Sequence, residues 1–198
     1  MPVESNGKLI IVSGPSGSGK TTVLRGVFDR FDGKQCLAKS VSATTRPPRP
    51  GEVDGEDYHF LTKEGFDERR RNGEFIECFE VFGRGYWYGT LKSEVSTGLS
   101  AGKWVVLEID VQGAMDVMKS YPDAVSIFVL PGSTEELQRR LRGRGTETEE
   151  ALRRRLEQAN SELALAGQYG YQVVNDDLDR AVREICDILT QEIGGRPQ

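Results

Sequence analysis

The sequence predicts an α/β fold: a P-loop NTPase-type parallel sheet flanked by helices. The first observation is the stretch 14–21, which matches the pattern G-x-x-x-x-G-K-[ST] at every fixed position. The second is its context, because an apolar, β-branched run (9–12) precedes the motif and a helical apolar stripe (21–31) follows it. The third is that strand-like and helix-like segments alternate along all 198 residues, which favours one α/β domain with inserted pieces.

The glycine-rich motif predicts a nucleotide phosphate site. Its glycines let the backbone curl so that successive N–H groups converge, and the start of the next helix adds positive potential. Lys20 is expected to reach the β- and γ-phosphates, and the Thr21 hydroxyl is expected to ligate Mg²⁺. The alternative is an ordinary glycine turn, which the flanking strand and helix disfavour.

The charge balance and hydropathy limit the partners. A formal net charge of −5 disfavours a broad nucleic-acid surface, whereas local groups of arginines suit a small anionic substrate. No stretch is long and apolar enough to span a bilayer, and residues 1–8 are short and polar. We therefore expect a soluble, cytoplasmic protein with no nucleic-acid or membrane partner.

Cysteine and histidine usage excludes several kinds of site. Cys36, Cys78 and Cys186 are odd in number and lack C-x-x-C spacing, so we expect buried free thiols rather than disulfides or a zinc site. His59 is the only histidine, which is too few for a multi-histidine metal site or a Ser-His-Asp triad. We expect its ring to be a packed strand residue.

The loop 42–52 is stiffened by three prolines and carries Arg46 and Arg49. Two guanidiniums on a rigid loop suit one phosphate, because little freedom is lost on binding. A solvated proline-rich turn fits the spacing equally well, so both interpretations stay open here.

Residues 42–98 break the strand–helix alternation and predict an inserted, mostly antiparallel lobe. Strands are expected at 58–61 and 74–81, and Thr62 is expected to cap a helix that carries Phe66 and ends near 72–73. The run 69–71 of three arginines is interpreted as the solvated face of that helix. Residues 86–90 supply aromatic and hydroxyl groups ahead of a helix at 91–98.

The apolar strand 104–110 ends in two acids, Glu108 and Asp110. In P-loop enzymes, an acid at the end of a strand beside the P-loop strand holds Mg²⁺ or its water. The alternative is that these acids cap the helix that starts near Val111.

The C-terminal third predicts two further strands and three helices. A strand at 124–129 is followed by a helix from Ser133 to Arg142 with a capped start, and Thr148 caps a second helix. That helix carries an apolar stripe made of Leu152, Leu156, Ala159, Leu163 and Ala166. A Gly-Arg-Gly tip (143–145) joins the two helices into a movable flap, while Arg142, Arg153 and Arg154 are assigned to solvent. The last strand (171–174) precedes a helix (178–193) with Val182, Ile185 and Leu189 on one face.

Several blocks in order resemble the guanylate kinase family of P-loop nucleoside monophosphate kinases. They cover nearly the whole chain and are specific: 14–21, 42–52, 75–77, 88–90, 109–113, 143–150 and 174–177. Two positions depart from the pattern of some relatives, with Glu108 in place of Asp and Thr90 in place of Ser. Both keep the chemical group.

The resemblance implies a three-part enzyme that converts ATP and GMP to ADP and GDP. Its core would comprise residues 8–41, 99–132 and 168–198, its GMP-binding lobe residues 42–98 and its helical lid region residues 133–167. It implies Mg²⁺ with ATP as the cofactor and ATP and GMP as substrates, with dGMP as a further candidate. A monomer and a homodimer both remain open.

The resemblance also implies roles for single residues. The residues assigned to ATP are Gly14, Pro15, Ser16, Gly17, Ser18, Gly19, Lys20, Thr21, Thr22 and, near adenine, Asn175. Those assigned to GMP are Ser42, Arg46, Arg49, Tyr58, Glu77, Tyr88, Thr90, Glu108, Asp110 and Gly113. The catalytic set is Lys20, Arg46, Arg140, Arg144 and Arg155, and the metal is assigned to Thr21 and, through water, Asp110.

Three alternatives are weighed against this interpretation. A small GTPase shares the D-x-x-G of residues 110–113, but the chain has no N-K-x-D motif for reading guanine. A non-catalytic guanylate kinase-like binding module is disfavoured because Lys20, Thr21, Asp110 and the lid arginines are all present. A kinase for uridylate or adenylate is the nearest alternative among enzymes.

Overall fold

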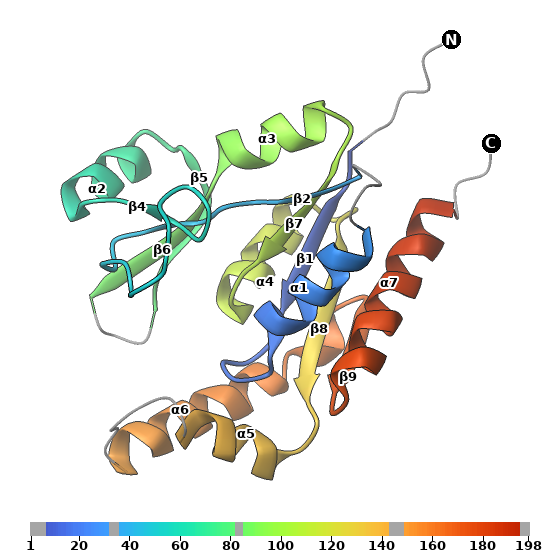
Figure 1. The fold of residues 1–198 in the computed structure, drawn as a ribbon. Coiled ribbons are helices and arrows are strands. Elements are labelled where there is room, and N and C mark those ends of the chain that lie inside the picture. The colour runs from blue at the N-terminus through green and yellow to red at the C-terminus, as the bar shows by residue number, and fades with distance from the viewer. Residues whose placement is uncertain (1–6, 32–35, 82–84, 143–148, 195–198) are drawn as a thin grey trace. The chain divides into compact units, whose positions relative to one another are not determined.

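The computed structural model describes residues 7–31, 36–81, 85–142 and 149–194 (Figure 1). The chain divides into two compact units. The first unit contains Met1–Ile10, Cys36–Leu107 and Gln112–Ala124. The second unit contains Ile11–Gln35, Glu108–Val111 and Val125–Gln198.

A five-stranded parallel sheet has the strand order β2-β7-β1-β8-β9. The strands are β1 Leu9–Ser13, β2 Leu37–Lys39, β7 Trp104–Glu108, β8 Val125–Pro131 and β9 Tyr171–Asn175. Every residue of β1 is buried, as expected for the central strand of a sheet covered on both faces. β7 lies next to β1, the strand that leads into the glycine-rich loop. Glu108 is the last residue of β7 and therefore ends the strand beside β1.

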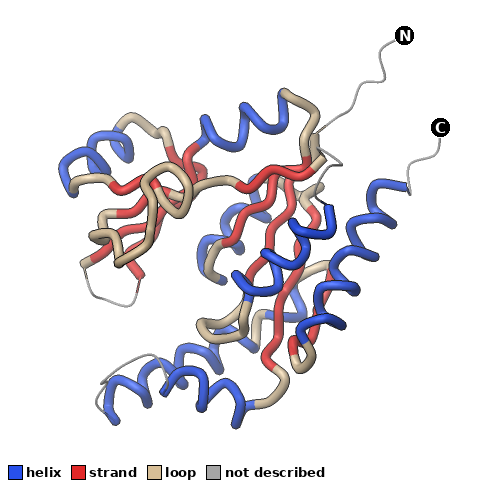
Figure 2. The backbone as a smooth tube through the Cα atoms, viewed as in Figure 1, coloured by secondary structure: helices blue, strands red, loops and turns tan. Residues whose placement is uncertain are grey.

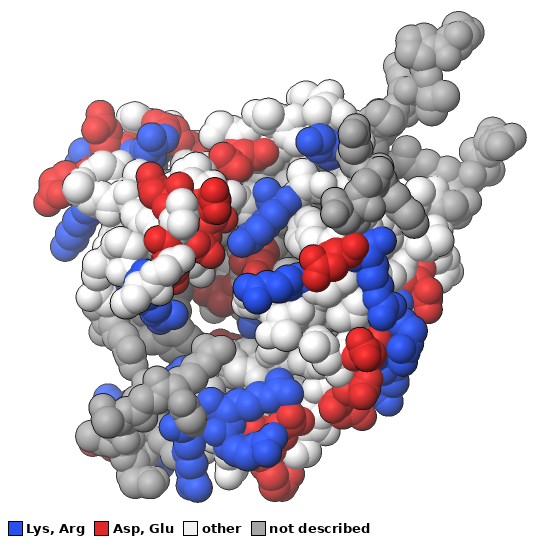
Figure 3. All heavy atoms as spheres, viewed as in Figure 1, with Lys and Arg blue, Asp and Glu red and all other residues white. Residues whose placement is uncertain are grey.

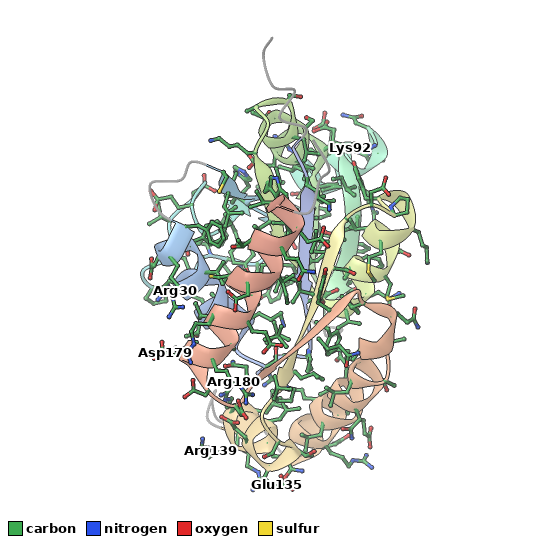
Figure 4. The ribbon with its side chains drawn as sticks, turned by 90° about the vertical axis from the view of Figure 1, so that its right-hand side faces the viewer. Arg30, Lys92, Glu135, Arg139, Asp179 and Arg180 are labelled. Carbon is green, nitrogen blue, oxygen red and sulfur yellow. The ribbon has the colours of Figure 1, made fainter. Side chains whose placement is uncertain are left out.

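The helices of the second unit are α1 Lys20–Phe31, α5 Thr134–Arg142, α6 Glu149–Leu163 and α7 Leu178–Gly194, with a 3₁₀ turn at Ala166–Gln168. α1 and α7 pack side by side (Figure 1), and a Cβ on Gly26 would lie 2.8 Å from Val182 Cγ2. Arg30 and Asp179 face each other at the surface of this pair, 4.0 Å apart (Figure 4). The predicted face of α7 is confirmed, because Val182, Ile185 and Leu189 are all buried.

α5 and α6 pack through a small apolar cluster. Its buried members are Leu137, Leu141 and Ala159, with Leu156 and Leu163 packed against them. The predicted cap of α5 is confirmed, because Ser133 Oγ accepts a hydrogen bond from Glu136 N at 3.1 Å. The predicted tip at 143–145 and the Thr148 cap lie outside the described residues.

The first unit holds a mixed four-stranded sheet in the order β4-β3-β6-β5 (Figure 2). Its strands are β3 Ala43–Thr44, β4 His59–Phe60, β5 Phe75–Val81 and β6 Tyr86–Leu91. Only β3 and β4 pair in parallel, which agrees with the mostly antiparallel lobe expected at 42–98. The remaining helices are α2 Lys63–Arg71, α3 Lys92–Ser100 and α4 Val111–Ser120.

α2 covers this sheet through a core of Ala43, Phe66, Phe75 and Leu91, in which the rings of Phe66 and Phe75 stack at 4.5 Å. The expected Thr62 cap is confirmed, since its side chain accepts a hydrogen bond from Gly65 N at 3.1 Å.

Several expectations need correction. Residues 86–91 form strand β6, which the sequence concealed because Gly89 stands inside it. A Cβ on Gly89 would lie 2.8 Å from the Phe75 ring, so the close approach of β5 requires glycine. α6 ends at Leu163, before Ala166, the last residue of the predicted apolar stripe.

The cysteines are free, as expected, but all three are half-buried rather than buried. Among the described residues, no helix is long and apolar enough to cross a membrane.

Candidate functional site

The glycine-rich loop connects β1 to α1 in the second unit and is held open by unusual backbone angles. Gly14 has φ +142° and Gly19 has φ +90°, a region that side-chain-bearing residues rarely adopt. A Cβ on Gly14 would lie 2.3 Å from Val129 O, and one on Gly19 would lie 2.4 Å from Asn175 Nδ2. Both positions therefore require glycine for space as well as for conformation.

Ser18 and Lys20 lie inside the curl. Lys20 Nζ donates to Gly14 O at 2.6 Å and to Pro15 O at 3.1 Å. Ser18 Oγ is fully buried and has no hydrogen-bond partner among the described residues. An orphaned hydroxyl donor inside a curl of backbone amides fits an anionic ligand, because a phosphate oxygen would satisfy it.

Three side chains from distant parts of the chain hold this loop. Asn175 Nδ2, at the end of β9, donates to Ser18 O at 2.7 Å. Arg140 Nη1, from α5, donates to Gly17 O at 3.2 Å and Ser18 O at 3.3 Å. Arg155 Nη2, from α6, donates to Ser16 Oγ at 3.3 Å.

The structure therefore brings two of the three predicted lid arginines onto the loop, while Arg144 lies outside the described residues. Lys and Arg side chains gather over α5 in the space-filling view (Figure 3), consistent with the arginines of its last turn. The solvent assignment of Arg142, Arg153 and Arg154 is confirmed, because all three are exposed.

Glu108, at the end of β7, accepts a hydrogen bond from the Thr21 hydroxyl at 2.5 Å. A hydroxyl and a carboxylate at the start of α1 are hard oxygen donors of the kind that Mg²⁺ takes alongside phosphate and water. Within the described ranges there is no group of three or more His, Cys, Asp or Glu residues that could hold a metal ion. The residues present thus fit a metal that depends on nucleotide phosphates for most of its ligands.

Asp110 and Glu162 add negative charge near the loop. Burial raises the pKa of Glu162, while the nearby Lys20 and a hydrogen bond from the Ser16 backbone act in the opposite direction. Burial also raises the pKa of Tyr169 to about 12, helped by the charges of Asp110 and Glu162. Of the other predicted ATP residues, Thr22 is exposed on the first turn of α1.

The second candidate anion-binding arrangement lies in the first unit, on the loop between β3 and β4. Arg46 is only 8% exposed. Its Nε donates to Tyr88 Oη at 3.1 Å, and its Nη1 donates to Pro47 O at 2.8 Å. Nη1 and Nη2 also donate to the two carboxylate oxygens of Glu52, at 2.9 and 2.8 Å. Arg46 is therefore buried within its loop, whereas residues 47–51 are exposed, as the alternative of a solvated proline-rich turn expects.

Two neighbouring aromatic rings lie beside the Arg46 guanidinium. Its Cζ lies 5.4 Å from the ring centroid of Tyr58 and 5.8 Å from that of Phe60. The Glu52 contact is the main cause that raises the pKa of Arg46, and the same contact lowers the pKa of Glu52. Arg49 has an exposed side chain, and its backbone N–H donates to Glu52 at 2.6 Å.

Glu77 and Thr90, both assigned to the guanine edge, meet across β5 and β6. They are register partners, and the buried Thr90 hydroxyl donates to Glu77 Oε1 at 2.6 Å. Strand alternation places Tyr88 and Thr90 on the same face of β6. One sheet face therefore links the Arg46 contacts to the Glu77–Thr90 pair.

The remaining GMP assignments are distributed differently. Ser42 is half-buried at the start of the arginine loop, residues 42–52. Its carbonyl accepts a hydrogen bond from His59 N at 2.9 Å. Gly113 is buried in α4. Glu108, assigned to GMP from the resemblance, instead contacts Thr21 of the glycine-rich loop.

Comparison with known proteins decides the family. The sequence profile of the guanylate kinase family matches residues 6–192. The chain belongs to the guanylate kinase family.

Individual guanylate kinases agree with this assignment. The chain is 55% identical over 187 residues to a guanylate kinase of Rhodopirellula baltica, covering 94% of this chain and 88% of that one. It is 48% identical over 181 residues to one of Trichormus variabilis, with 91% and 88% covered. The crystal structure of guanylate kinase from Anaplasma phagocytophilum superposes with a TM-score of 0.75 at 34% identity, covering 96% and 88% of the two chains.

Two acids in this guanylate kinase were not assigned from the sequence. Glu162 lies seven residues after Arg155 on α6, a spacing of two helical turns that places both on one face of the helix. This spacing could have identified Glu162 as an acid near the glycine-rich loop. Glu52 is the last residue of the arginine loop. From the sequence, only its contact with the Arg49 backbone, three residues earlier, could have been predicted. His59 is a half-buried strand residue, as expected, and its Nε2 lies 3.1 Å from Glu94 Oε1.

Proposed function

We propose that this guanylate kinase transfers the γ-phosphate of ATP to the phosphate of GMP by means of two separate anion-binding arrangements. One is the glycine-rich loop of the second unit, and the other is the arginine loop of the first. The observation that carries the proposal is the shared face of β6, where Tyr88 contacts the phosphate arginine and Thr90 contacts Glu77. The proposed phosphate site and the proposed base site therefore lie on the same face of β6, two residues apart along the strand.

The base specificity follows from the hydrogen-bond pattern of guanine. Guanine presents N1–H and N2–H₂ donors beside an O6 acceptor, so the Glu77 carboxylate would accept from the donors. The hydroxyls of Thr90 and Ser42 would face the rest of that edge. Adenine inverts the pattern and would leave the carboxylate against a ring nitrogen lone pair. An unpaired buried group costs about 1–3 kcal/mol, and more when it is charged.

On the ATP side, we infer that the phosphates take the place of contacts that the loop now makes with itself. Lys20 would turn from the carbonyls of Gly14 and Pro15 to the β- and γ-phosphates. The backbone of residues 14–19 and the Ser18 hydroxyl would donate to the same phosphates. Arg140, Arg155 and Arg144 would neutralise the transferring group, and Asn175 would lie near adenine.

The metal is assigned to Thr21 together with Glu108, with Asp110 acting through water. This places Glu108 on the metal side, where the resemblance alone had put it with GMP. Bound Mg²⁺ would neutralise phosphate charge during transfer. The short Thr21–Glu108 contact supports this choice.

The reaction needs positioning more than covalent help from the protein. A GMP phosphate oxygen attacks the γ-phosphorus, the new P–O bond forms and the bond to the ADP oxygen breaks. Water would compete for the γ-phosphate in an open site, so the core, GMP-binding lobe (42–98) and lid region (133–167) would close around both substrates before transfer. Arg140 would then matter more for turnover than for GMP affinity.

The proposal extends to the cellular setting. Three free cysteines are typical of a reducing compartment, which supports a cytoplasmic enzyme acting on free ATP and GMP. dGMP is a candidate substrate, because no residue assigned above is committed to the ribose 2′-hydroxyl.

The test is a coupled ADP-release assay with ATP and Mg²⁺, run separately with GMP, AMP, UMP and CMP. We expect rapid turnover with GMP and at least about 10²-fold lower kcat/KM with the other acceptors. Equal use of AMP or UMP would overturn the base assignment. GTP hydrolysis without transfer to GMP would support a GTPase, and GMP binding without turnover would support a binding module.

A further inference from the structure

Glu52 has no role in the function described so far, yet it organises the arginine loop. Its two carboxylate oxygens accept from Arg46 Nη1 and Nη2, and Oε2 also accepts from the Arg49 backbone at 2.6 Å. Its side chain is only 19% exposed. One carboxylate therefore fixes both arginines of the loop, one through its guanidinium and the other through its backbone.

The donors of Arg46 can be counted. A guanidinium has five N–H groups. In the structure, Nε–H is directed to Tyr88, the two Nη1 hydrogens to Pro47 O and Glu52, and one Nη2 hydrogen to Glu52. Among the contacts of the described residues, this leaves one Nη2 hydrogen. Arg46 can thus offer a phosphate a single N–H in a fixed direction, but not a bidentate fork.

We propose that Glu52 is a positioning residue for the GMP phosphate, holding Arg46 in its binding geometry without contacting the nucleotide. The inference rests on the proposed function and adds a residue to its phosphate site. Phosphate is then bound by the remaining Nη2 hydrogen of Arg46, the Tyr88 hydroxyl and the exposed Arg49 side chain.

Burial explains why Arg46 needs this partner. Arg46 is 8% exposed and its guanidinium lies beside the rings of Tyr58 and Phe60, so it would be an uncompensated charge without a carboxylate next to it. The Glu52 contact also removes rotamer freedom from a long side chain before the ligand arrives, which lowers the cost of binding. Alternatively, Glu52 would be an internal anion that the GMP phosphate must displace from Arg46. In that case, removing its charge would strengthen GMP binding instead of weakening it.

The experiment measures GMP and guanosine binding by calorimetry to the full chain and to Glu52→Gln. We expect Glu52→Gln to weaken GMP binding about 10- to 100-fold and to leave guanosine binding unchanged. Tighter or unchanged GMP binding would overturn the proposal. Glu56→Gln is the matched control, since this exposed acid lies between β3 and β4, four residues beyond Glu52, and none of the described contacts involves its side chain; it should bind GMP like the parent.

A double-mutant cycle separates positioning from a general structural role. In an Arg46→Ala background, Glu52→Gln should cause little further loss of GMP affinity, because Glu52 acts through Arg46. Fully additive losses would contradict this. Glu52→Asp keeps the charge and should bind GMP better than Glu52→Gln, which also provides a second variant if the first folds poorly.

In steady-state assays, Glu52→Gln should raise the KM for GMP more than it lowers kcat. Failure of the proposed function would be recognised separately, because the parent protein itself would then either not bind GMP or bind it without forming GDP.

Discussion

The two proposed anion-binding arrangements of this guanylate kinase are built from different groups of the chain. The glycine-rich loop of the second unit presents backbone amides and tolerates no Cβ at Gly14 or Gly19. The arginine loop of the first unit presents one buried guanidinium, held by Glu52 and two rings. The backbone of the glycine-rich loop is contacted by side chains from β9, α5 and α6. The Arg46 guanidinium is instead held mainly by Glu52 of its own loop, with Tyr88 as a partner from β6.

Each arrangement also includes an acid, with a different task. Glu108 accepts from Thr21 and adds an oxygen donor where the metal is expected. Glu52 neutralises Arg46 and fixes its direction. Glu108 would thus bind the metal, whereas Glu52 would hold the side chain of Arg46.

The largest expected effect concerns Lys20, the charged side chain of the glycine-rich loop. Lys20→Ala should lower kcat by about 10³-fold, because a charge next to the transferring phosphate is lost. GMP binding, which belongs to the other arrangement, should hardly change. The coupled assay and GMP calorimetry measure both quantities.

Lys63→Ala is the control for this variant, since Lys63 is exposed at the start of α2. A Lys20→Ala enzyme that retains the parent's kcat would break the distinction between the two arrangements.

The next effect concerns base reading, which only the first unit is proposed to perform. Glu77→Gln should lower kcat/KM for GMP by about 10²-fold and narrow the preference for GMP over AMP, because the carboxylate that accepts from N1–H and N2–H₂ is lost. The KM for ATP should stay unchanged. Kinetics with both acceptors test this, with the exposed Glu68→Gln as control; an unaltered GMP:AMP ratio would refute the base-reading role.

A pair of glycines compares the two loops directly. Gly19 and Gly51 have φ +90° and +89°, but their surroundings differ. A Cβ added at Gly19 would lie 2.4 Å from Asn175 Nδ2, whereas one added at Gly51 would have nothing within 4 Å. Alanine at either position should cost about 1–2 kcal/mol of unfolding free energy through backbone strain. Gly19→Ala should cost more and should also weaken ATP binding.

Denaturant unfolding with and without ATP checks this pair of variants. Equal destabilisation by the two substitutions, with ATP binding intact in both, would show that the Asn175 contact at Gly19 has no energetic weight.

The smallest effect is a pH dependence at Glu52. Arg46 lowers the pKa of Glu52 below its ordinary value of 4.5, so the ionised carboxylate stabilises the folded state above that pH. The contribution should be lost as the pH falls from about 4.5 through the folded-state pKa. The stability difference between the parent and Glu52→Gln, about 1 kcal/mol at neutral pH, should therefore shrink in acid. Chemical unfolding at pH 7 and at successively lower pH values measures it, and a difference that is constant with pH would contradict the linkage.

The features that could be predicted from sequence are those encoded over a few residues. The glycine-rich loop, the Thr62 and Ser133 caps and the buried face of α7 all follow from local spacing. The β6 strand was hidden because Gly89 has low strand propensity, and only packing against Phe75 explains it.

The contacts of Glu108 and Arg140 could not be predicted from the sequence, because they depend on the fold. The contact of Glu108 with Thr21 joins residues 87 positions apart, and that of Arg140 with Gly17 joins residues 123 apart. No pattern in the sequence identifies Glu108 as an acid that contacts Thr21. Their side-chain directions depend on where β7 ends beside β1.

The most direct test of phosphoryl transfer follows the phosphorus itself. The protein is incubated with Mg²⁺, GMP and ATP labelled in its γ-phosphate, and the products are separated during the first turnovers. The account predicts that the label appears in the β-phosphate of GDP, with one GDP formed for each ADP. Label released as inorganic phosphate, with GMP left unchanged, would contradict it.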